Sequence, residues 1–294
     1  MKDSKKIWDE LIPYLDKDIH PCIVCNSTKF EIWAKQGYLK ALKCKDCGMI
    51  SVNPHFSEEG LNYFYSNYFS YRQDDELLNK QRDETYLIDR DWVCNFVKNG
   101  DLLDIGCSGG FFLSKFPSKY YNREGVEVGS DAAKFAKENF NIHVHTGQVT
   151  EINFPKKYDL VMMRGVIEHF KDPIKVLNKC SKIIKKGGML FLTATPAGDA
   201  FAFNVYRENW RMFTPLEHIH FFTVQILTKV LNDLGFEPVA HHYQYAETPY
   251  ANVDQDFNKI KKDIIDINNG TAKKNIDSPP FPGSMFTALW KKVK

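Results

Sequence analysis

The stretch Asp101-Leu-Leu-Asp-Ile-Gly-Cys-Ser-Gly-Gly110 decides the fold of this chain. Its first half is an apolar run that predicts a buried strand, and the glycines that follow predict a tight turn. Gly106 and Gly109 let the backbone approach a bound molecule where a Cβ would collide. A strand that ends in such a turn opens a doubly wound α/β domain, whose ligands bind beyond the carboxyl ends of the strands. We therefore expect a ligand site directly after this strand.

An acidic residue in the turn indicates the kind of ligand. A dinucleotide-binding turn reads Gly-x-Gly-x-x-Gly, whereas here Asp104 stands in place of the first glycine. A carboxylate repels a pyrophosphate and attracts a molecule that carries an ammonium group and a sulfonium centre. The turn therefore argues against a dinucleotide and favours a cationic cofactor.

The turn resembles motif I of the class I S-adenosylmethionine-dependent methyltransferases, with Ser108 at a position where glycine is usual. The motifs of that family follow in order over roughly residues 99–245. The resemblance implies an α/β, Rossmann-like sheet of seven strands and S-adenosylmethionine as the cofactor. It assigns to the cofactor turn a first group of residues, namely Asp104, Gly106, Cys107 and Gly109.

Later motifs add further expected cofactor contacts. Glu127 lies 23 residues beyond Asp104, where the resemblance places the acid that holds both ribose hydroxyls. A carboxylate suits a diol because it offers two acceptors and no donor. The segment Thr146–Val149 stands at the adenine-binding turn, which assigns Gln148 and Val149 to the adenine.

The predicted fourth strand, residues 158–163, is followed by Arg164-Gly-Val-Ile-Glu-His-Phe170. This segment is close to the Val-x-Glu-His run of small-molecule members of the family, and we place Arg164 in the cofactor site. Tyr71 is a further candidate, because its hydroxyl could reach the carboxylate of the cofactor.

Four cysteines are spaced as a metal site. They form two Cys-x-x-Cys pairs, which 18 residues separate, and the ligands are Cys22, Cys25, Cys44 and Cys47. Each pair forms a tight knuckle whose thiolates face one point, so two pairs can surround one zinc ion tetrahedrally. Asn26 and Gly48 suit the left-handed backbone that closes a knuckle. Four thiolates leave no open position, so we expect a structural zinc; two reduced, unoccupied pairs are the alternative.

Composition sets broad limits on location and partners. The net charge is +2, and no long basic block indicates a nucleic-acid footprint. The first residues lack the apolar core of a signal peptide, and no run of 18 apolar residues occurs. We therefore expect a cytoplasmic protein without a membrane span.

The chain divides into an appendage and a core domain. We expect a helix in 1–19, a zinc ribbon in 20–52, a helical connector in 53–98 and the methyltransferase domain in 99–294. An aromatic and basic insertion, 197–220, emerges where the fifth strand ends and can build the acceptor pocket. A polar excursion, 246–280, is either a lid or a surface feature. Residues 285–293 are expected to form a final strand, antiparallel at the sheet edge.

Methyl transfer to a hydroxyl needs an acceptor in line with the sulfonium methyl and a base for the proton. Histidine suits the task because its ordinary pKa is ~6.5. We expect His218, oriented by Glu217, to be the base, with His169 and His220 as alternates. Arg207 and Arg211 either clamp a phosphate of the acceptor or stack on aromatic rings.

Bacterial sugar C-methyltransferases combine an N-terminal zinc unit with this core and carry a Tyr-x-Glu-His segment at the acceptor site. Glu217-His218 matches the last two positions, whereas Pro215 stands at the tyrosine position. The resemblance implies a sugar-like acceptor, such as a nucleotide-linked sugar of cell-surface polysaccharide or secondary metabolism. Because carbon methylation needs more acid-base machinery, we expect transfer to oxygen.

Two other functions remain open. An RNA base methyltransferase with a zinc ribbon is one, although the fourth strand lacks the Pro-Pro-aromatic turn that acts on exocyclic base amines. A non-catalytic zinc-ribbon adaptor is the other, and its mark would be a spoiled cofactor site. Asp104, Gly106, Gly109 and Glu127 are all present, which argues against the adaptor.

Overall fold

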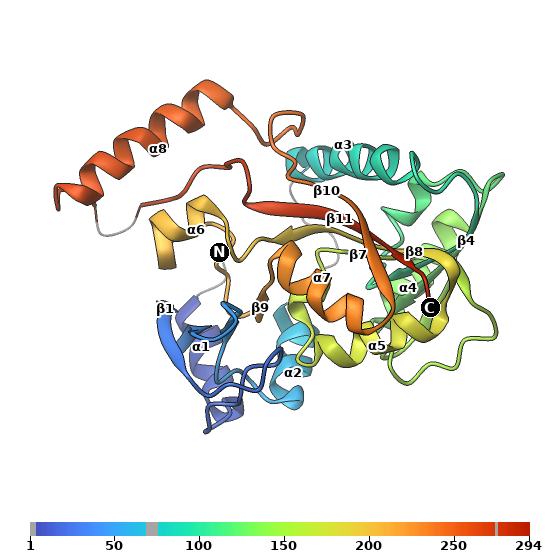
Figure 1. Ribbon diagram of the computed structural model, residues 1–294, viewed down its shortest axis with the longest axis horizontal. Coiled ribbons are helices and arrows are strands. Elements are labelled where there is room, and N and C mark those ends of the chain that lie inside the picture. Colours follow the sequence, from blue (N-terminus) through green and yellow to red (C-terminus); the bar gives the residue numbers. More distant parts are fainter. Residues whose placement is uncertain (1–3, 69–75, 274–275) are drawn as a thin grey trace.

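In the computed structural model, which describes residues 4–68, 76–273 and 276–294, the chain forms a large sheet and a small one (Figure 1). The large sheet has the order β10-β11-β8-β7-β4-β5-β6. Its strands are β4 (Gly100–Ile105), β5 (Tyr121–Glu127), β6 (His143–Thr146), β7 (Tyr158–Arg164), β8 (Ile184–Pro196), β10 (Phe236–His242) and β11 (Met285–Lys292). This is the predicted α/β, Rossmann-like, seven-stranded sheet.

Helices cover both faces of the large sheet. Ala136 of α4 packs with Val93 of α3 in one core, whereas Leu177 of α5 and Leu227 of α7 belong to the other. The central strand β7 is buried along almost its whole length, as expected for a parallel strand that is covered on both faces. The helices are α1 (Ser4–Leu11), α2 (Glu58–Tyr68), α3 (Glu76–Val93), α4 (Ser130–Phe140), α5 (Pro173–Ile183), α6 (Phe201–Tyr206), α7 (Val224–Asp233) and α8 (Val253–Asn268), with short 3-10 turns η1 (Ile12–Tyr14), η2 (Leu113–Lys115), η3 (Ile167–His169) and η4 (Arg207–Asn209).

The last strand does not lie at the sheet edge, so that expectation was wrong. β11 is antiparallel, as predicted, but it pairs with β8 on one side and with β10 on the other. Its residues from Phe286 to Trp290 are all buried. A strand that is apolar on both faces is stable only when it is covered, which places it inside the sheet.

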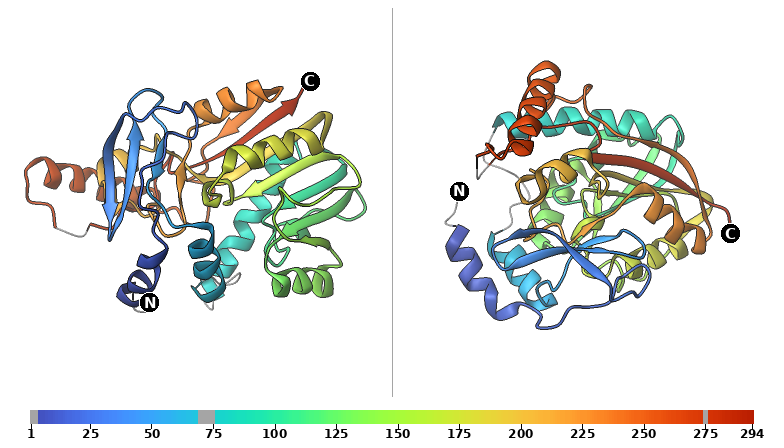
Figure 2. Two further views of the ribbon diagram at one scale, coloured as in Figure 1. Left: turned by 90° about the horizontal axis from the view of Figure 1, so that it is seen from below. Right: turned by 60° about the vertical axis from the view of Figure 1, so that its left-hand side comes forward.

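The small sheet joins the cysteine-rich region to the core domain. Its order is β1 (Phe30–Gln36), β2 (Leu39–Cys44), β3 (Ile50–Val52) and β9 (His220–Phe221). The first three strands come from the predicted ribbon, whereas β9 comes from the end of the predicted insertion. Figure 2 shows this sheet at one end of the molecule. The division of the chain into a ribbon, a connector and a core domain stays a prediction.

The insertion packs its aromatic side chains inward. Phe203, Trp210 and Phe213 are buried together with Phe221 of β9, and the rings of Phe203 and Trp210 stack with centroids 4.5 Å apart. These side chains form a core between the two sheets. Aromatic rings bury a large apolar area, so these side chains stabilise the packing of the insertion, and its role in an acceptor pocket stays a prediction.

Helix α8 accounts for much of the polar excursion, and it projects from the body of the protein (Figure 1). Two buried acids tie it down. Asp256 accepts a hydrogen bond from the Tyr245 hydroxyl at 2.8 Å, and Asp263 accepts one from the Tyr206 hydroxyl at 2.6 Å. No helix within the described residues is both long and apolar enough to cross a membrane.

A buried acid links α3 to three strands or loops of the core. Asp89 is fully buried and accepts hydrogen bonds from Arg164 Nε at 2.7 Å, Thr193 Oγ1 at 2.8 Å and Gln244 Nε2 at 2.8 Å. The guanidinium of Arg164 also lies 4.5 Å from the ring centroid of Tyr86. This network holds α3 against the end of β7.

We expect Asp89→Ala to lower the free energy of unfolding by about 3–5 kcal/mol, because it leaves Arg164 without its buried partner. Urea denaturation followed by circular dichroism measures the change. Asp91→Ala is the matched control, because Asp91 is exposed on the same helix. A loss below about 1 kcal/mol at Asp89 would show that the network contributes little.

Candidate methyl-donor and acceptor sites

The turn after β4 is held against β5. The carbonyl oxygen of Val126 accepts hydrogen bonds from the N–H groups of Gly106 at 2.8 Å and Cys107 at 3.0 Å. Gly106 has a φ of +71°, and a Cβ there would lie 2.8 Å from a methyl carbon of Val166. Ser108 adopts a φ of +51°, which is uncommon for a residue other than glycine. The turn therefore presents its backbone at the carboxyl end of the sheet.

Glu127 organises the predicted cofactor site. Its carboxylate accepts hydrogen bonds from the N–H groups of Ser108 at 2.9 Å, Val128 at 2.8 Å and Gly129 at 3.0 Å. Its backbone carbonyl accepts one from Gly147 N–H at 2.9 Å. The glycine turn, the predicted ribose acid and the predicted adenine turn thus meet at one place.

Asp104 lies under this site and is buried. Burial raises the pKa of Asp104 to about 8, nearby Arg164 lowers it, and Glu127 raises it further. With that pKa the carboxyl is largely uncharged at neutral pH, and a cation bound beside it favours its ionised form. The contact of Asp104 with a positively charged ligand stays a prediction.

A second cluster lies at the end of β7. Glu168 and His169 stand on η3, and His218 lies four residues after Thr214, in the segment before β9. The ring centroids of His169 and His218 are 5.0 Å apart, and the Tyr65 hydroxyl of α2 lies 3.0 Å from His169 Nδ1. Three distant parts of the chain therefore meet beside the predicted methyl-donor site.

Hydrogen bonds set the orientation of His218. Its Nδ1 lies 2.8 Å from the carbonyl oxygen of Met212, which can only accept, so Nδ1 carries the proton. Nε2 is then a lone-pair acceptor. Burial lowers the pKa of His218 and lowers the pKa of His169 to about 3, so both rings are uncharged at neutral pH.

Two expectations about this cluster gain no support from the observed hydrogen bonds. Met212 and Thr214 orient His218, whereas we expected Glu217 in that role. His220 is not available as an alternate base: its Nδ1 lies 2.9 Å from Ser51 Oγ and its Nε2 lies 3.4 Å from the carbonyl oxygen of Lys171. Both of its ring nitrogens are thus engaged in holding β9.

Glu168 is a buried acid in the same cluster. Its Oε2 has no hydrogen-bond partner within the described residues, and burial raises the pKa of its carboxyl to about 8. The ligand atoms of Glu168, His169 and His218 lie within 4.8 Å of one another. One carboxylate and two imidazoles can hold a divalent cation, and equally they can bind a polar acceptor.

The four cysteines of the ribbon converge as predicted. All four sulfur atoms lie within 4.8 Å of one another, with 3.5 Å between the sulfurs of Cys22 and Cys47 and 3.6 Å between those of Cys25 and Cys44. Tetrahedral zinc with Zn–S bonds of ~2.3 Å needs sulfurs about 3.8 Å apart. Asn26 and Gly48 adopt φ values of +58° and +79°, as knuckles require. The cysteine cluster therefore fits zinc.

Comparison with known proteins decides the family. Residues 79–241, more than half of the chain, match the family model described as a methyltransferase domain. The chain belongs to this methyltransferase family. The predicted family and the predicted fold are thereby confirmed, and the cofactor of this family is S-adenosylmethionine.

Curated relatives match only part of this methyltransferase. The ubiquinone biosynthesis O-methyltransferase of Colwellia psychrerythraea is 27% identical over 33% of the chain and 44% of its own length. The protein of the same name from Dinoroseobacter shibae is 28% identical over 49% of the chain and 63% of its own length. The chain thus spans less than two thirds of either relative.

Solved structures share the fold of the methyltransferase. A SAM-dependent methyltransferase from Thermotoga maritima has a TM-score of 0.52 and 19% identity, over 80% of this chain and all of the other. Magnesium protoporphyrin IX methyltransferase from Synechocystis, solved with bound SAH, has a TM-score of 0.50 and 12% identity, over 80% of this chain and 95% of the other.

The remaining residues that we predicted to contact the cofactor do not share one environment. The side chain of Arg164 is engaged with Asp89. Cys107 is buried and packs on Gly125, where a Cβ would come within 2.4 Å of its sulfur. Val149 is buried, whereas Gln148 is exposed at the adenine turn. Tyr71 lies outside the described residues. The cofactor roles of these residues stay predictions.

Sequence reasoning overlooked two residues of this region. Val128, directly after Glu127, is 63% exposed, and an apolar side chain at that place can pack on the adenine. Tyr65 is not among the predicted site residues, although its hydroxyl lies 3.0 Å from His169 Nδ1. No signal in the sequence points to Tyr65, because it lies 104 residues away from its partner.

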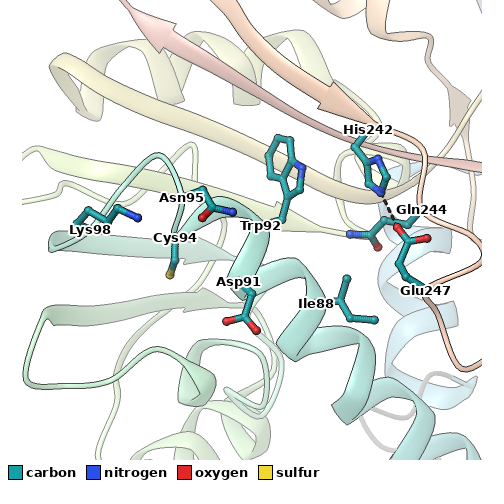
Figure 3. Close-up of a pocket in the computed structure, with 9 residues that line it drawn as sticks. All are labelled: Ile88, Asp91, Trp92, Cys94, Asn95, Lys98, His242, Gln244 and Glu247. Atoms are coloured by element: carbon teal, nitrogen blue, oxygen red, sulfur yellow. Dashed lines mark hydrogen bonds and ion pairs between the residues drawn. The ribbon is translucent and has the colours of Figure 1, made fainter.

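One hollow on the methyltransferase lies beside α3. It measures about 630 Å³ and opens between α3 and the chain after β10, with Trp92, His242, Gln244 and Glu247 on its walls (Figure 3). None of the residues that line it is a predicted cofactor or acceptor residue. The donor site is therefore inferred from the turn and from Glu127.

We expect the purified methyltransferase to carry about one zinc ion per chain, because four thiolates form a closed tetrahedral site. Elemental analysis by mass spectrometry measures the metal content. Cys44→Ser is expected to abolish zinc retention, and Cys94→Ser, outside the cluster, is the matched control. Full-length protein that stays free of zinc after expression with added zinc would contradict the assignment.

Proposed function

We propose that this protein is an S-adenosylmethionine-dependent methyltransferase that methylates a hydroxyl of a small polar acceptor in the cytoplasm. The acceptor we propose is a sugar or a nucleotide-linked sugar. The observation that carries the proposal is the uncharged Nε2 of His218, held beside His169 and Tyr65 at the same sheet end as the donor turn. The relatives named O-methyltransferases support transfer to oxygen.

In this proposal Glu127 holds the ribose hydroxyls of the donor, and buried Asp104 favours its positive charge. S-adenosylmethionine supplies an electrophilic methyl group on a sulfonium centre. His218 Nε2 accepts the proton of the acceptor hydroxyl, while the hydrogen bond from Nδ1–H to Met212 keeps the ring in place. Tyr65 and Glu168 offer further hydrogen bonds to the acceptor. The zinc supports structure and takes no part in the transfer.

The phosphate clamp expected of Arg207 has no support in the structure. Its guanidinium carbon lies 3.5 Å from the ring centroid of Trp33 in β1, so this arginine stacks on the ribbon. Stacking on an aromatic ring was the alternative left open by the sequence. We therefore do not base the choice of a nucleotide-linked acceptor on this residue.

We expect kcat/KM to rise with pH along a single acidic limb that is centred below pH 6.5. The reason is that His218 must be uncharged to accept a proton, and burial holds its pKa below the ordinary 6.5. Burial raises the pKa of both Glu168 and Asp104 to about 8, so an inflection near pH 8 has two candidate groups. Glu168→Gln should remove the contribution of Glu168 to that inflection and keep the acidic limb. Activity that declines as the pH rises from 5 to 7 would contradict a histidine base.

The acceptor is tested by incubating the protein with isotope-labelled S-adenosylmethionine and separate panels of nucleotide sugars, polar metabolites, quinol precursors and structured RNA. Mass shifts report the product. We expect a labelled methyl group on a sugar hydroxyl. Labelled RNA would favour the base methyltransferase, and labelled quinol would move the function towards that of the named relatives. Binding of the cofactor without any product would favour the adaptor.

A further inference from the structure

We infer that the zinc ribbon is the positioning scaffold of the acceptor site, and that it acts through the segment 214–221 that carries His218. This inference rests on the proposed function, because it assigns that segment to the acceptor. It adds that the metal controls acceptor chemistry and leaves the methyl-donor site unaffected.

Ile219 forms backbone hydrogen bonds to both the ribbon and the core, and these bonds fix the position of its neighbour His218. Ile219, the next residue in the chain, donates its N–H to the carbonyl oxygen of Glu168 at 2.8 Å. Its own carbonyl oxygen accepts a hydrogen bond from the N–H of Val52, also at 2.8 Å. The path therefore runs from β3 through Ile219 to η3, the turn that carries Glu168 and His169.

Two side chains from residues 51–55 form further hydrogen bonds with the segment 214–221. His55 is buried, and its Nε2 lies 2.9 Å from the carbonyl oxygen of Pro215. This oxygen can only accept, so the His55 ring donates to it. Ser51 Oγ lies 2.9 Å from His220 Nδ1. Glu217 and His218 thus lie between two anchors that both come from residues 51–55.

The metal site determines where these anchors lie. Cys44 is the last residue of β2, and its N–H donates to the carbonyl oxygen of Met49 at 2.8 Å, just before β3 begins. β3 itself has only three residues. It pairs with β2 on one side and with β9 on the other, so a metal bound to Cys44 and Cys47 fixes the chain that leads from β2 into this pairing.

The donor site is anchored differently. Its turn is held by the backbone of Val126 and by the carboxylate of Glu127, both at the end of β5 in the large sheet. Loss of the ribbon's order should therefore displace His218 and leave the donor turn in place. A displacement of about 1 Å in a reacting group can cost ~100-fold in rate.

The test compares three variants of the full-length protein: His55→Leu, His55→Gln and Cys44→Ser/Cys47→Ser. We expect His55→Leu to lower kcat/KM for the acceptor about tenfold, since it removes one buried hydrogen bond. His55→Gln retains a donor and should recover most of that loss. The double cysteine variant should lose about 100-fold. In all three, calorimetry should give an S-adenosylmethionine Kd within about twofold of that of the unchanged protein.

Hydrogen–deuterium exchange gives a readout that is independent of activity. In the double cysteine variant, exchange should rise in peptides that cover 40–56 and 214–221 and stay unchanged over 100–129. Cys94→Ser, with its zinc site intact, should match the unchanged protein in both regions and in activity.

Three outcomes would overturn the inference. They are acceptor kinetics that survive loss of the metal, a cofactor Kd that weakens as much as turnover, and His55→Gln behaving like His55→Leu. Failure of the proposed function looks different: no acceptor is methylated, yet removal of the metal still exposes 214–221. That result would keep the positioning role and reject the assigned chemistry.

Discussion

His218→Ala is expected to lower kcat by about 10²–10⁴-fold while the affinity for S-adenosylmethionine stays unchanged. The estimate is the usual contribution of a positioned general base. The reaction requires an uncharged group that takes the proton of the substrate hydroxyl. Nε2 of His218 is such a group, because the hydrogen bond from Nδ1–H to Met212 leaves the lone pair on Nε2. Steady-state kinetics with the identified acceptor and calorimetry with the cofactor measure the two quantities.

Control variants separate this role from loss of structure. Free imidazole added to the His218→Ala protein should restore part of the activity, because the deletion leaves space for the ring. His242→Gln is the surface control, because His242 lines the hollow of Figure 3, and no predicted site residue lines that hollow. If His169→Ala lowers kcat much more than His218→Ala does, the base is His169 and the assignment to His218 is wrong.

Glu127→Ala is expected to weaken binding of S-adenosylmethionine by about 3–5 kcal/mol, because hydrogen bonds to a charged group contribute roughly 1.5–3 kcal/mol each. Two such bonds to the ribose diol are lost. In addition, Ser108, Val128 and Gly129 lose the acceptor that holds their N–H groups. Isothermal titration calorimetry measures the change in Kd.

The matched control for this change is Glu151→Ala, because Glu151 is exposed just beyond the adenine turn. Its cofactor affinity should be unaltered. Glu127→Gln should fall between the two, since an amide keeps one acceptor oxygen without the charge. A Glu127→Ala protein that binds the cofactor within threefold of the unchanged protein would show that another residue holds the ribose.

Local patterns in the sequence were sufficient to predict strands of the large sheet. The strands expected in the first half of 101–110 and at 158–163 both occur, as β4 and β7, with small shifts at their ends. Each is an apolar run bounded by turn residues, so its identity depends on neighbours in the chain. The cysteine knuckles are equally local, because each pair spans four residues.

Long-range contacts were less predictable. The place of β11 depends on which edge of β8 is open, and its own pattern revealed only that it is buried. The choice between candidate bases was equally hard to predict, because His218 and His220 lie two residues apart and look alike in the sequence. Only the pairing of Ser51 with His220 shows that one is engaged in structure and the other faces the acceptor region.

The sequence by itself determined the kind of cofactor and predicted the kind of metal. Both depend on short stretches, the Asp104 turn and the Cys-x-x-Cys pairs, in which chemistry follows from residue type and spacing. Tertiary structure alone decided which residues meet at the proposed acceptor site. Tyr65, His169 and His218 come from α2, η3 and the chain before β9, and the ribbon holds the last of them through Val52 and His55. Such contacts join residues tens to more than a hundred positions apart, so no local pattern records them.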